Sequence, residues 1–382
     1  MLRRASSLII ARKVADTVAN HSFDYKILFL KRASKLKWAE ILAYPGGIVE
    51  DADVQYVKKN FSHSQNLSDP EVFDYNVLKV ASLRETYEET GLLFLENGLL
   101  KTDEINVVNN ILRNSLQENK LPSFFECADL LKLAYGKSLV EISRMVSVPH
   151  LPNRYNCQFF LCVAEPEKTL NMYKAMESTK YLHDLDDLVV HKSESSEYRW
   201  LNPYELLTGA LNKTIKLAPP QYMLANIMMS FPKIETLQKY LNDIRTKSES
   251  VNKGKDHFER NPLTYPLMIG MANHTEAKFL NKGYQVAGLF PTDVEYPLDK
   301  FLQMEKDPAW KKEMDEKVRN LDAKNRGVCR IYFKQMKEMF DADYEFEIQS
   351  QVDFPFQHMV GLEELKKKLM TITVSYPPSG QN

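Results

Sequence analysis

The chain has 382 residues, a length that suits two domains, or one large domain with an extension. Its 50 basic and 51 acidic residues give a formal net charge of −1, which argues against a strong overall field for nucleic acid or an anionic membrane. A hydrophobic content of 44% and a charged content of 26% are ordinary for a globular protein with a sizeable core. No stretch approaches the roughly 20 apolar residues that a membrane-spanning helix needs.

The cysteines contain no C-x-x-C pair, so the sequence predicts no zinc site. Cys157 and Cys162 lie in the apolar run "CQFFLCVA" and are expected to be buried thiols, which favours a reducing intracellular compartment. Cytoplasm, peroxisome and mitochondrion all stay open. The start "MLRRASSLIIARK" is basic enough for a mitochondrial presequence, although we favour it as the first strand, and the end "PPSGQN" is not a peroxisomal tripeptide.

The first elements are predicted from two short apolar runs, "SLIIARKVA" and "YKILFLKRA", which indicate neighbouring strands or a hairpin. In "LAYPGGIVEDAD", Pro45-Gly46-Gly47 is typical of a tight loop. The following residues 54–77 are polar and lack steady periodicity. We predict an inserted loop there, with at most a short helix at each end.

A helix is predicted from about residue 77 to residue 90, with Gly91 placed to end it. Two more helices are expected at about 103–118 and 124–145, followed by a buried strand at "QFFLCVAEP". The run "SEYRWLNPYELLTGALN" predicts a strand, a turn and a helix that Asn202-Pro203 opens. The runs "PPQYMLANIMMSF" and "IETLQKYLNDIRT" predict further helices.

The polar stretch at residues 247–256 is the expected domain boundary. It separates a domain at 1–246 from a C-terminal extension at 257–376 that we expect to pack on it. Four runs in the extension predict strands: "YPLMIGMA", "GYQVAGLF", "RGVCRIYF" and "YEFEIQS". A charged helix is expected near residues 308–325.

The stretch "ASLRETYEETGLLFLE" combines an apolar stripe with a cluster of carboxylates. At about 100° per residue, the helix gathers its apolar side chains on one side. These are Val80, Leu83 and Tyr87. The opposite arc carries Glu85, Glu88 and Glu89. Arg84 lies at the border of this arc and can pair with Glu88 four residues later.

Carboxylates this close repel one another unless a positive charge lies between them. Mg²⁺ and Mn²⁺ prefer oxygen ligands, and a metal held by a helix opposite a glycine loop suits hydrolysis of a phosphoanhydride. The alternative is a solvated acidic surface. The helix pattern by itself does not separate these two interpretations.

The wider pattern resembles the signature of the Nudix hydrolase family. Residues 84–92, Arg-Glu-Thr-Tyr-Glu-Glu-Thr-Gly-Leu, match its second half with Thr86 at an apolar position. Gly47 resembles the first glycine, and Asp53 stands where the family has a glutamate. The 30 residues 54–83 stand where the family has seven, which places an insertion at about 54–80.

One branch of the family, the peroxisomal coenzyme A diphosphatases, has a box interrupted in this way. Three further runs resemble that branch: "YPGGIVEDAD", "LPNRYNCQFFLCV", and "LAPPQ" at residues 217–221. The resemblance covers roughly residues 5–240. It implies an α/β/α sandwich around a mixed sheet, with a C-terminal α/β extension.

The resemblance also implies roles for single residues. Glu85, Glu88 and Glu89 would hold Mg²⁺ or Mn²⁺, and one of them, with Glu85 as first candidate, would act as the general base. Arg84 would orient these carboxylates, and Gly46 and Gly47 would let the backbone approach the metal. Asp53 has two open roles, as a ligand or as a structural partner, and Asp51 competes for its place.

Arg32 and Arg154 are candidate phosphate clamps, because an arginine fork matches phosphate oxygens. Ion pairs at the edge of the sheet are an equally good explanation of both arginines. The sequence does not separate the two.

The implied substrate is a small nucleotide, with coenzyme A or an acyl-CoA first, giving 3′,5′-ADP and a phosphopantetheine. ADP-ribose, a dinucleotide and an RNA cap are the alternative substrates. A Nudix-fold binding module with weak catalysis is the alternative of another class. Membranes and nucleic acids are not expected partners, and the oligomeric state stays open.

Overall fold

The computed structural model describes most of the N-terminal two thirds of the chain and short pieces of the rest. The described residues are 2–14, 23–34, 39–61, 70–90, 92, 94, 123–125, 128, 139–147, 153–164, 188, 194–212, 214–229, 231–251, 270–273, 286–289, 299, 303, 308, 311–312, 330–333 and 347–348.

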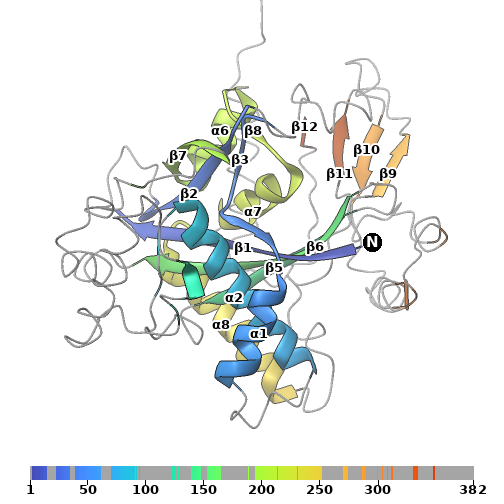
Figure 1. Ribbon diagram of the computed structural model, residues 1–382. Helices are drawn as coiled ribbons and strands as arrows, with labels where there is room; N and C mark the ends of the chain where they lie inside the picture. Colours follow the sequence, from blue (N-terminus) through green and yellow to red (C-terminus); the bar gives the residue numbers. More distant parts are fainter. Residues whose placement is uncertain are drawn as a thin grey trace, which may run out of the picture.

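An eight-stranded mixed sheet forms the centre of this part (Figure 1). Its strands are β1 (Leu2–Lys13), β2 (Tyr25–Arg32), β3 (Ile41–Ala43), β4 (Gly46–Ile48), β5 (Val140–Val146), β6 (Arg154–Ala164), β7 (Ser195–Leu201) and β8 (Lys216–Leu217). The order is β5-β6-β1-β2-β3-β8, with β4 paired to β1 and β7 paired to β2. Strand β1 runs parallel to β6 and antiparallel to β2 and β4.

Helices cover both faces of the sheet. They are α1 (Asp51–Phe61), α2 (Pro70–Thr90), α6 (Pro203–Leu211), α7 (Pro219–Met229) and α8 (Ile234–Val251). Because side chains alternate along a strand, Leu8 and Ile10 of β1 join a core with α1 and α2. Ile9 and Ala11 join a second core with α6, α7 and α8. These two cores confirm the predicted α/β class with a mixed sheet between helices.

The predicted strands at the start of the chain, at "QFFLCVAEP" and before Asn202 are confirmed, as are the helices α6, α7 and α8. Asn202 caps α6 as expected, since its side chain accepts from the Glu205 amide at 2.8 Å. Cys162 is buried and Cys157 is half-buried, both as free thiols. Among the described helices, none is long and apolar enough to cross a bilayer.

The short helix allowed at each end of residues 54–77 is confirmed, while residues 62–69, where the inserted loop is predicted, lie outside the described residues. Helix α1 occupies 51–61, and α2 begins at Pro70, seven residues before the predicted start. The helical periodicity of α1 was hidden because one of its buried positions is the carboxylate Asp53, while Tyr56 and Val57 fill the others. A charged residue is expected at the surface in a sequence pattern, and only its buried partner explains why it lies inside.

The helix predicted at 124–145 is wrong at its C-terminal end, where "VEISRMV" forms strand β5. Non-local pairing decides this segment, because β5 forms an antiparallel ladder with β6 from Val140↔Leu161 to Val146↔Asn156. Helix α8 continues to Val251, into the polar stretch at 247–256.

The C-terminal segment contains the four strands that the sequence predicts. They are β9 (Gly270–Asn273), β10 (Val286–Leu289), β11 (Arg330–Phe333) and β12 (Glu347–Ile348), which form an antiparallel sheet in the order β12-β11-β10-β9. The helix at 103–118, Gly91 and most of 308–325 lie outside the described residues. The domain boundary and the packing of the extension stay predictions.

Candidate metal-binding and catalytic site

The site is built where helix α2 crosses the short strand β4. A Cβ atom on Gly47 would lie 2.4 Å from the carboxylate carbon of Glu85, so any side chain at this position would displace the glutamate. The Gly46 amide donates to Glu89 Oε2 at 3.0 Å, and Gly46 has φ 155°, where a Cβ would meet Ser7. The two glycines therefore let the backbone of β4 lie directly against the carboxylates of α2.

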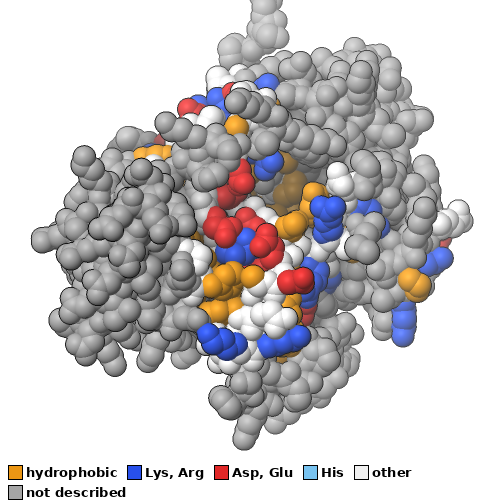
Figure 2. Space-filling model, viewed as in Figure 1, with side chains coloured by type: hydrophobic (Ala, Val, Ile, Leu, Met, Phe, Trp, Pro, Cys, Tyr) orange, Lys and Arg blue, Asp and Glu red, His pale blue; other side chains and the backbone are white. Residues whose placement is uncertain are grey.

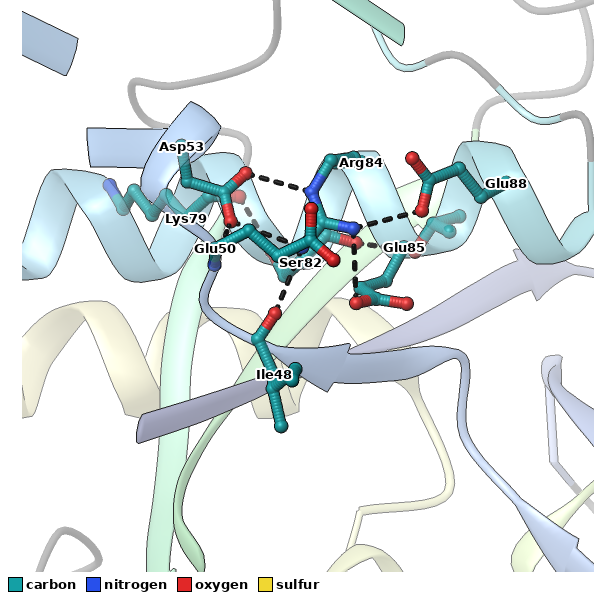
Figure 3. A network of polar contacts seen from close by, with 9 residues as sticks. Ile48, Glu50, Asp53, Lys79, Ser82, Arg84, Glu85 and Glu88 are labelled. Carbon is teal, nitrogen blue, oxygen red and sulfur yellow. Dashed lines mark hydrogen bonds and ion pairs between the residues drawn. The ribbon is translucent and has the colours of Figure 1, made fainter. Parts of the chain in front are cut away.

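Arg84 is the centre of the polar network at this crossing (Figure 3). Its side chain is 2% exposed, and it donates from Nε and Nη2 to the two carboxylate oxygens of Asp53 at 2.9 and 3.1 Å. Nη1 lies 2.8 Å from Glu88 Oε2 and 3.1 Å from Glu85 Oε1. Nη2 also donates to the carbonyl of Ile48 at 2.9 Å. One guanidinium thus joins α1, α2 and β4.

Asp53 is fully buried, and both of its oxygens are engaged. Besides the fork of Arg84, Oδ2 accepts from the Glu50 amide at 2.8 Å, so the carboxylate reaches back to the residue that precedes α1. Asp51, the competing candidate, is exposed in the first turn of α1. The geometry therefore gives Asp53 the contacts of a structural partner for Arg84.

The other carboxylates differ in exposure. The side chains of Glu85 and Glu88 are 13% and 50% exposed, and Glu89 is 9% exposed. A solvated acidic surface therefore describes Glu88, but not Glu85 and Glu89. Figure 2 shows acidic side chains gathered near the centre of this face, beside a hollow.

Burial is the main cause that raises the pKa of Glu89 to about 8; the Gly46 amide and Arg32 oppose the rise, and the charges of Glu85 and Glu194 contribute to it. Burial also raises the pKa of Glu85 to about 7, with Glu88 and Glu194 adding to the rise while Arg84 opposes it. The pKa of Glu88 is raised by burial as well, against the pull of Arg84. The pocket therefore favours either protonation or an added positive charge.

Glu194 is the residue that sequence reasoning missed. It lies just before β7, and its charge acts on both Glu85 and Glu89. Its carbonyl accepts from the Ala33 amide at 2.9 Å, so the pairing of β2 with β7 places it there. No local signal marks it, because the polar run "KSESSE" reads as an ordinary loop.

The structure separates the two predicted phosphate clamps. Arg32 ends β2 close enough for its charge to act on Glu89, and its buried Nε has no hydrogen-bond partner. Arg154 begins β6 beside Leu2, is 8% exposed, and donates from Nε to the Ser147 carbonyl at 3.2 Å. Arg32 therefore lies with the carboxylates, and Arg154 lies at the end of the sheet.

Within the described part of the chain, no three His, Cys, Asp or Glu side chains already form the arrangement of a metal site. The donor set nevertheless fits a hard divalent cation, because Glu85 and Glu89 offer buried oxygens whose ionisation a cation would favour. Glu88 is the third donor on the same helix and needs to share its oxygens with Arg84.

One known protein and several solved structures are similar to parts of the chain. No family model matches the chain. A protein of Caenorhabditis elegans named putative nudix hydrolase 7 is 24% identical over 220 residues, which are 57% of this chain and 58% of that protein. The matched region is thus less than two thirds of the relative's length. This similarity is in keeping with the resemblance of residues 84–92 to the Nudix signature.

Two solved structures are similar to parts of the chain. A Nudix hydrolase from Alicyclobacillus acidocaldarius is 21% identical, with a TM-score of 0.43, over 63% of this chain and 96% of that chain. The Nudix domain of Shewanella oneidensis NrtR, crystallised with ADP-ribose, is 8% identical, with a TM-score of 0.29, over 59% of this chain and 84% of that chain.

Replacing Gly47 by alanine tests the close approach of β4 to α2. In Gly47→Ala the new Cβ overlaps the Glu85 carboxylate, so we expect Mn²⁺ affinity to fall at least tenfold in isothermal titration calorimetry while the circular dichroism spectrum is kept. Gly209→Ala in α6 is the matched control, because its Cβ meets the side chain of Ile215 and no carboxylate. Equal Mn²⁺ affinity in Gly47→Ala and wild type would contradict this geometry.

The pair of Arg84 and Asp53 is tested by a double-mutant cycle of Arg84→Lys and Asp53→Asn. Each single change leaves a buried partner without its fork, so we expect each to lower the free energy of unfolding by about 3 kcal/mol. The double variant should lose much less than the sum, as measured by guanidinium chloride denaturation. Additive losses would show that the two side chains act independently.

Proposed function

We propose that the chain hydrolyses a diphosphate linkage in a nucleoside diphosphate derivative, with Mg²⁺ or Mn²⁺ held by Glu85, Glu88 and Glu89. The observation that carries the proposal is the neighbouring carboxylates of Glu89, which is buried, and Glu85, which is 13% exposed, both lying against Gly46 and Gly47. A buried pair of like charges is unfavourable without a cation. Such a pair of carboxylates suits the binding of a metal ion that also contacts the anionic diphosphate.

The bound metal would supply neutralisation of the phosphate charge and a more acidic water. The residues of the chain then divide the remaining tasks. The Gly46 amide fixes the Glu89 carboxylate, and Arg84 fixes Glu85 and Glu88 through its buried guanidinium. Arg32, with its free Nε, is placed to donate to a phosphate oxygen.

The general base is a carboxylate near the water that attacks the diphosphate. Glu85 is our first candidate, because its pKa of about 7 lies near the working pH that favours proton transfer. Glu194 is the second, since its charge reaches both Glu85 and Glu89 and it is exposed. Arg84 takes a positioning role, because its donors are already engaged by protein oxygens.

Coenzyme A or an acyl-CoA is the substrate we place first, with 3′,5′-ADP and a phosphopantetheine as products. Its support is the resemblance at residues 217–221, "LAPPQ", of which Leu217 forms the end of β8 and the rest leads into α7. ADP-ribose, a dinucleotide and an RNA cap are the alternatives that the same chemistry would accept.

Product analysis by liquid chromatography tests both site and substrate. The protein is incubated with coenzyme A, ADP-ribose, NADH or capped RNA, each with Mg²⁺ or Mn²⁺. We expect 3′,5′-ADP from coenzyme A, and at least a hundredfold loss of rate in Glu89→Gln. Glu235→Gln is the matched control, since this glutamate is exposed on α8 and pairs with Lys13.

The other outcomes of that experiment separate the proposals. Turnover of another substrate, lost in Glu89→Gln, keeps the site and rejects coenzyme A. Metal uptake by folded protein without turnover of any substrate rejects the hydrolase and favours the binding module. Equal rates in Glu89→Gln and wild type would reject the site itself.

Glu194→Gln separates a role for this residue in the reaction from mere proximity. We expect kcat to fall at least tenfold at saturating metal, because a carboxylate whose charge acts on Glu85 and Glu89 either binds the metal or accepts the proton. A raised midpoint for Mn²⁺ activation would assign metal binding, and an unchanged midpoint would assign proton transfer. Glu197→Gln, on the neighbouring β7, is the control. An unchanged kcat contradicts both roles.

A further inference from the structure

The pairing of β2 with β7 becomes irregular at Arg32, where β2 ends (Figure 1). Lys31 and Arg32 are consecutive, but their partners on β7 lie two positions apart, so Ser196 is the extra residue of a β-bulge. A bulge increases the local twist and redirects the side chains beside it. Beyond it, the Glu194 carbonyl accepts from the amide of the residue after Arg32 at 2.9 Å. The bulge therefore adjoins the two residues outside α2 whose side-chain charges act on Glu89.

Lys31 and Arg32 take opposite faces of the sheet. Side chains alternate along a strand, and Leu28 of β2 packs in the core with α2 while Phe29 packs in the other core. Arg32 is four residues after Leu28 and therefore faces α2, in agreement with the effect of its charge on Glu89. Lys31 faces away from the carboxylates. Any influence of Lys31 on the site therefore passes through the backbone.

Glu40, which directly precedes β3, contacts both of these residues. Its amide donates to the Arg32 carbonyl at 3.1 Å, and its Oε2 lies 2.5 Å from Lys31 Nζ. Among the residues that the structure describes, Glu40 is the only non-glycine residue with a positive φ, at 65°. A residue with a side chain disfavours this left-handed region and stays there only where the surrounding structure holds it. The Lys31 ion pair and the bond to the Arg32 carbonyl supply such contacts.

The pair of Lys31 and Glu40 is more than a surface ion pair. Partly exposed pairs contribute little stability, and these side chains are 24% and 40% exposed. However, the strained backbone belongs to the residue that is bonded to Arg32, and the buried Nε of Arg32 has no hydrogen-bond partner. A guanidinium that its own Nε does not anchor takes its position from the backbone that carries it.

We propose that Glu40 is a positioning residue for Arg32. The left-handed conformation of Glu40 directs its amide to the Arg32 carbonyl, which fixes the end of β2 and aims the guanidinium at a diphosphate bound beside Glu89. The ion pair with Lys31 holds Glu40 in this conformation. The inference rests on the proposed function, because it needs a phosphate oxygen at Arg32. Glu40 itself touches neither the metal nor the substrate.

The test measures binding of methylenediphosphonate, a diphosphate analogue that resists hydrolysis, to the full chain with Mg²⁺ by isothermal titration calorimetry. We expect Arg32→Ala to weaken binding about tenfold, through loss of the charged donor. Glu40→Val should weaken it about fivefold, since a β-branched side chain opposes a positive φ. Glu40→Gly should stay within about twofold of wild type, because glycine adopts this conformation without strain. Glu235→Val is the matched control, at an exposed glutamate that also pairs with a lysine.

Double variants separate positioning from a general structural role. Glu40→Val should cost nothing further in the Arg32→Ala background, because Glu40 acts only through Arg32. Lys31→Met, which leaves the backbone of Glu40 unaltered, should weaken binding about threefold in wild type and have no effect in Glu40→Gly, where no strain has to be held. Equal losses in both backgrounds of either pair would indicate a merely structural role and overturn the inference.

The remaining outcomes also decide the matter. Equal affinity of folded Glu40→Val and wild type, or equal losses in Glu40→Val and Glu40→Gly, would overturn the inference. Unchanged binding in Arg32→Ala, or no binding by wild type, would do the same without deciding hydrolysis, which the product analysis measures. If the chain binds the analogue as expected but hydrolyses no diphosphate, the proposed function fails while the positioning role stands. If it hydrolyses one, kcat/KM should fall in Glu40→Val and recover in Glu40→Gly.

Discussion

The buried guanidinium of Arg84 is the interaction on which the site depends. A charge that is 2% exposed is costly unless every donor has an acceptor, and here the acceptors come from three separate elements. Asp53 of α1, Glu85 and Glu88 of α2 and the Ile48 carbonyl of β4 all converge on it. Displacement of any one of these elements would leave a buried charge uncompensated, so Arg84 fixes their relative positions.

The two glycines of β4 determine how close this assembly can become. Gly47 has no side chain to separate β4 from Glu85, and Gly46 presents its amide to Glu89. As a result, the carboxylates of Glu85 and Glu89 lose most of their contact with water, and Glu89 keeps one backbone donor, the Gly46 amide. Desolvation therefore raises their pKa values more than Arg84 and the Gly46 amide lower them. The same deficit of positive charge is what a divalent cation would supply.

Local patterns predicted the parts of the molecule that local interactions determine. The apolar stripe of Val80, Leu83 and Tyr87 is buried, and Arg84 pairs with Glu88 four residues later, as helical spacing requires. Strand β5 was predicted as a helix because its pairing with β6 leaves no local trace. Glu194 was missed for the same reason, since the ladder of β2 with β7 carries it to the carboxylates. The metal and substrate assignments depend on groups that the sequence does not contain.

The contacts of Asp53 explain how it can reach Arg84 although 30 residues separate the two in the sequence. In the sequence, 30 residues separate Asp53 from Arg84, and this gap makes the motif look broken. In the fold, α1 and the first turns of α2 occupy the described part of the gap, and Asp53 returns to Arg84 at 2.9 Å. The shorter aspartate suffices because it sits in the first turn of α1, with Glu50 donating to it. The helices α1 and α2 thus bring Asp53 to Arg84 across this gap, while Gly47 of β4 lies against Glu85.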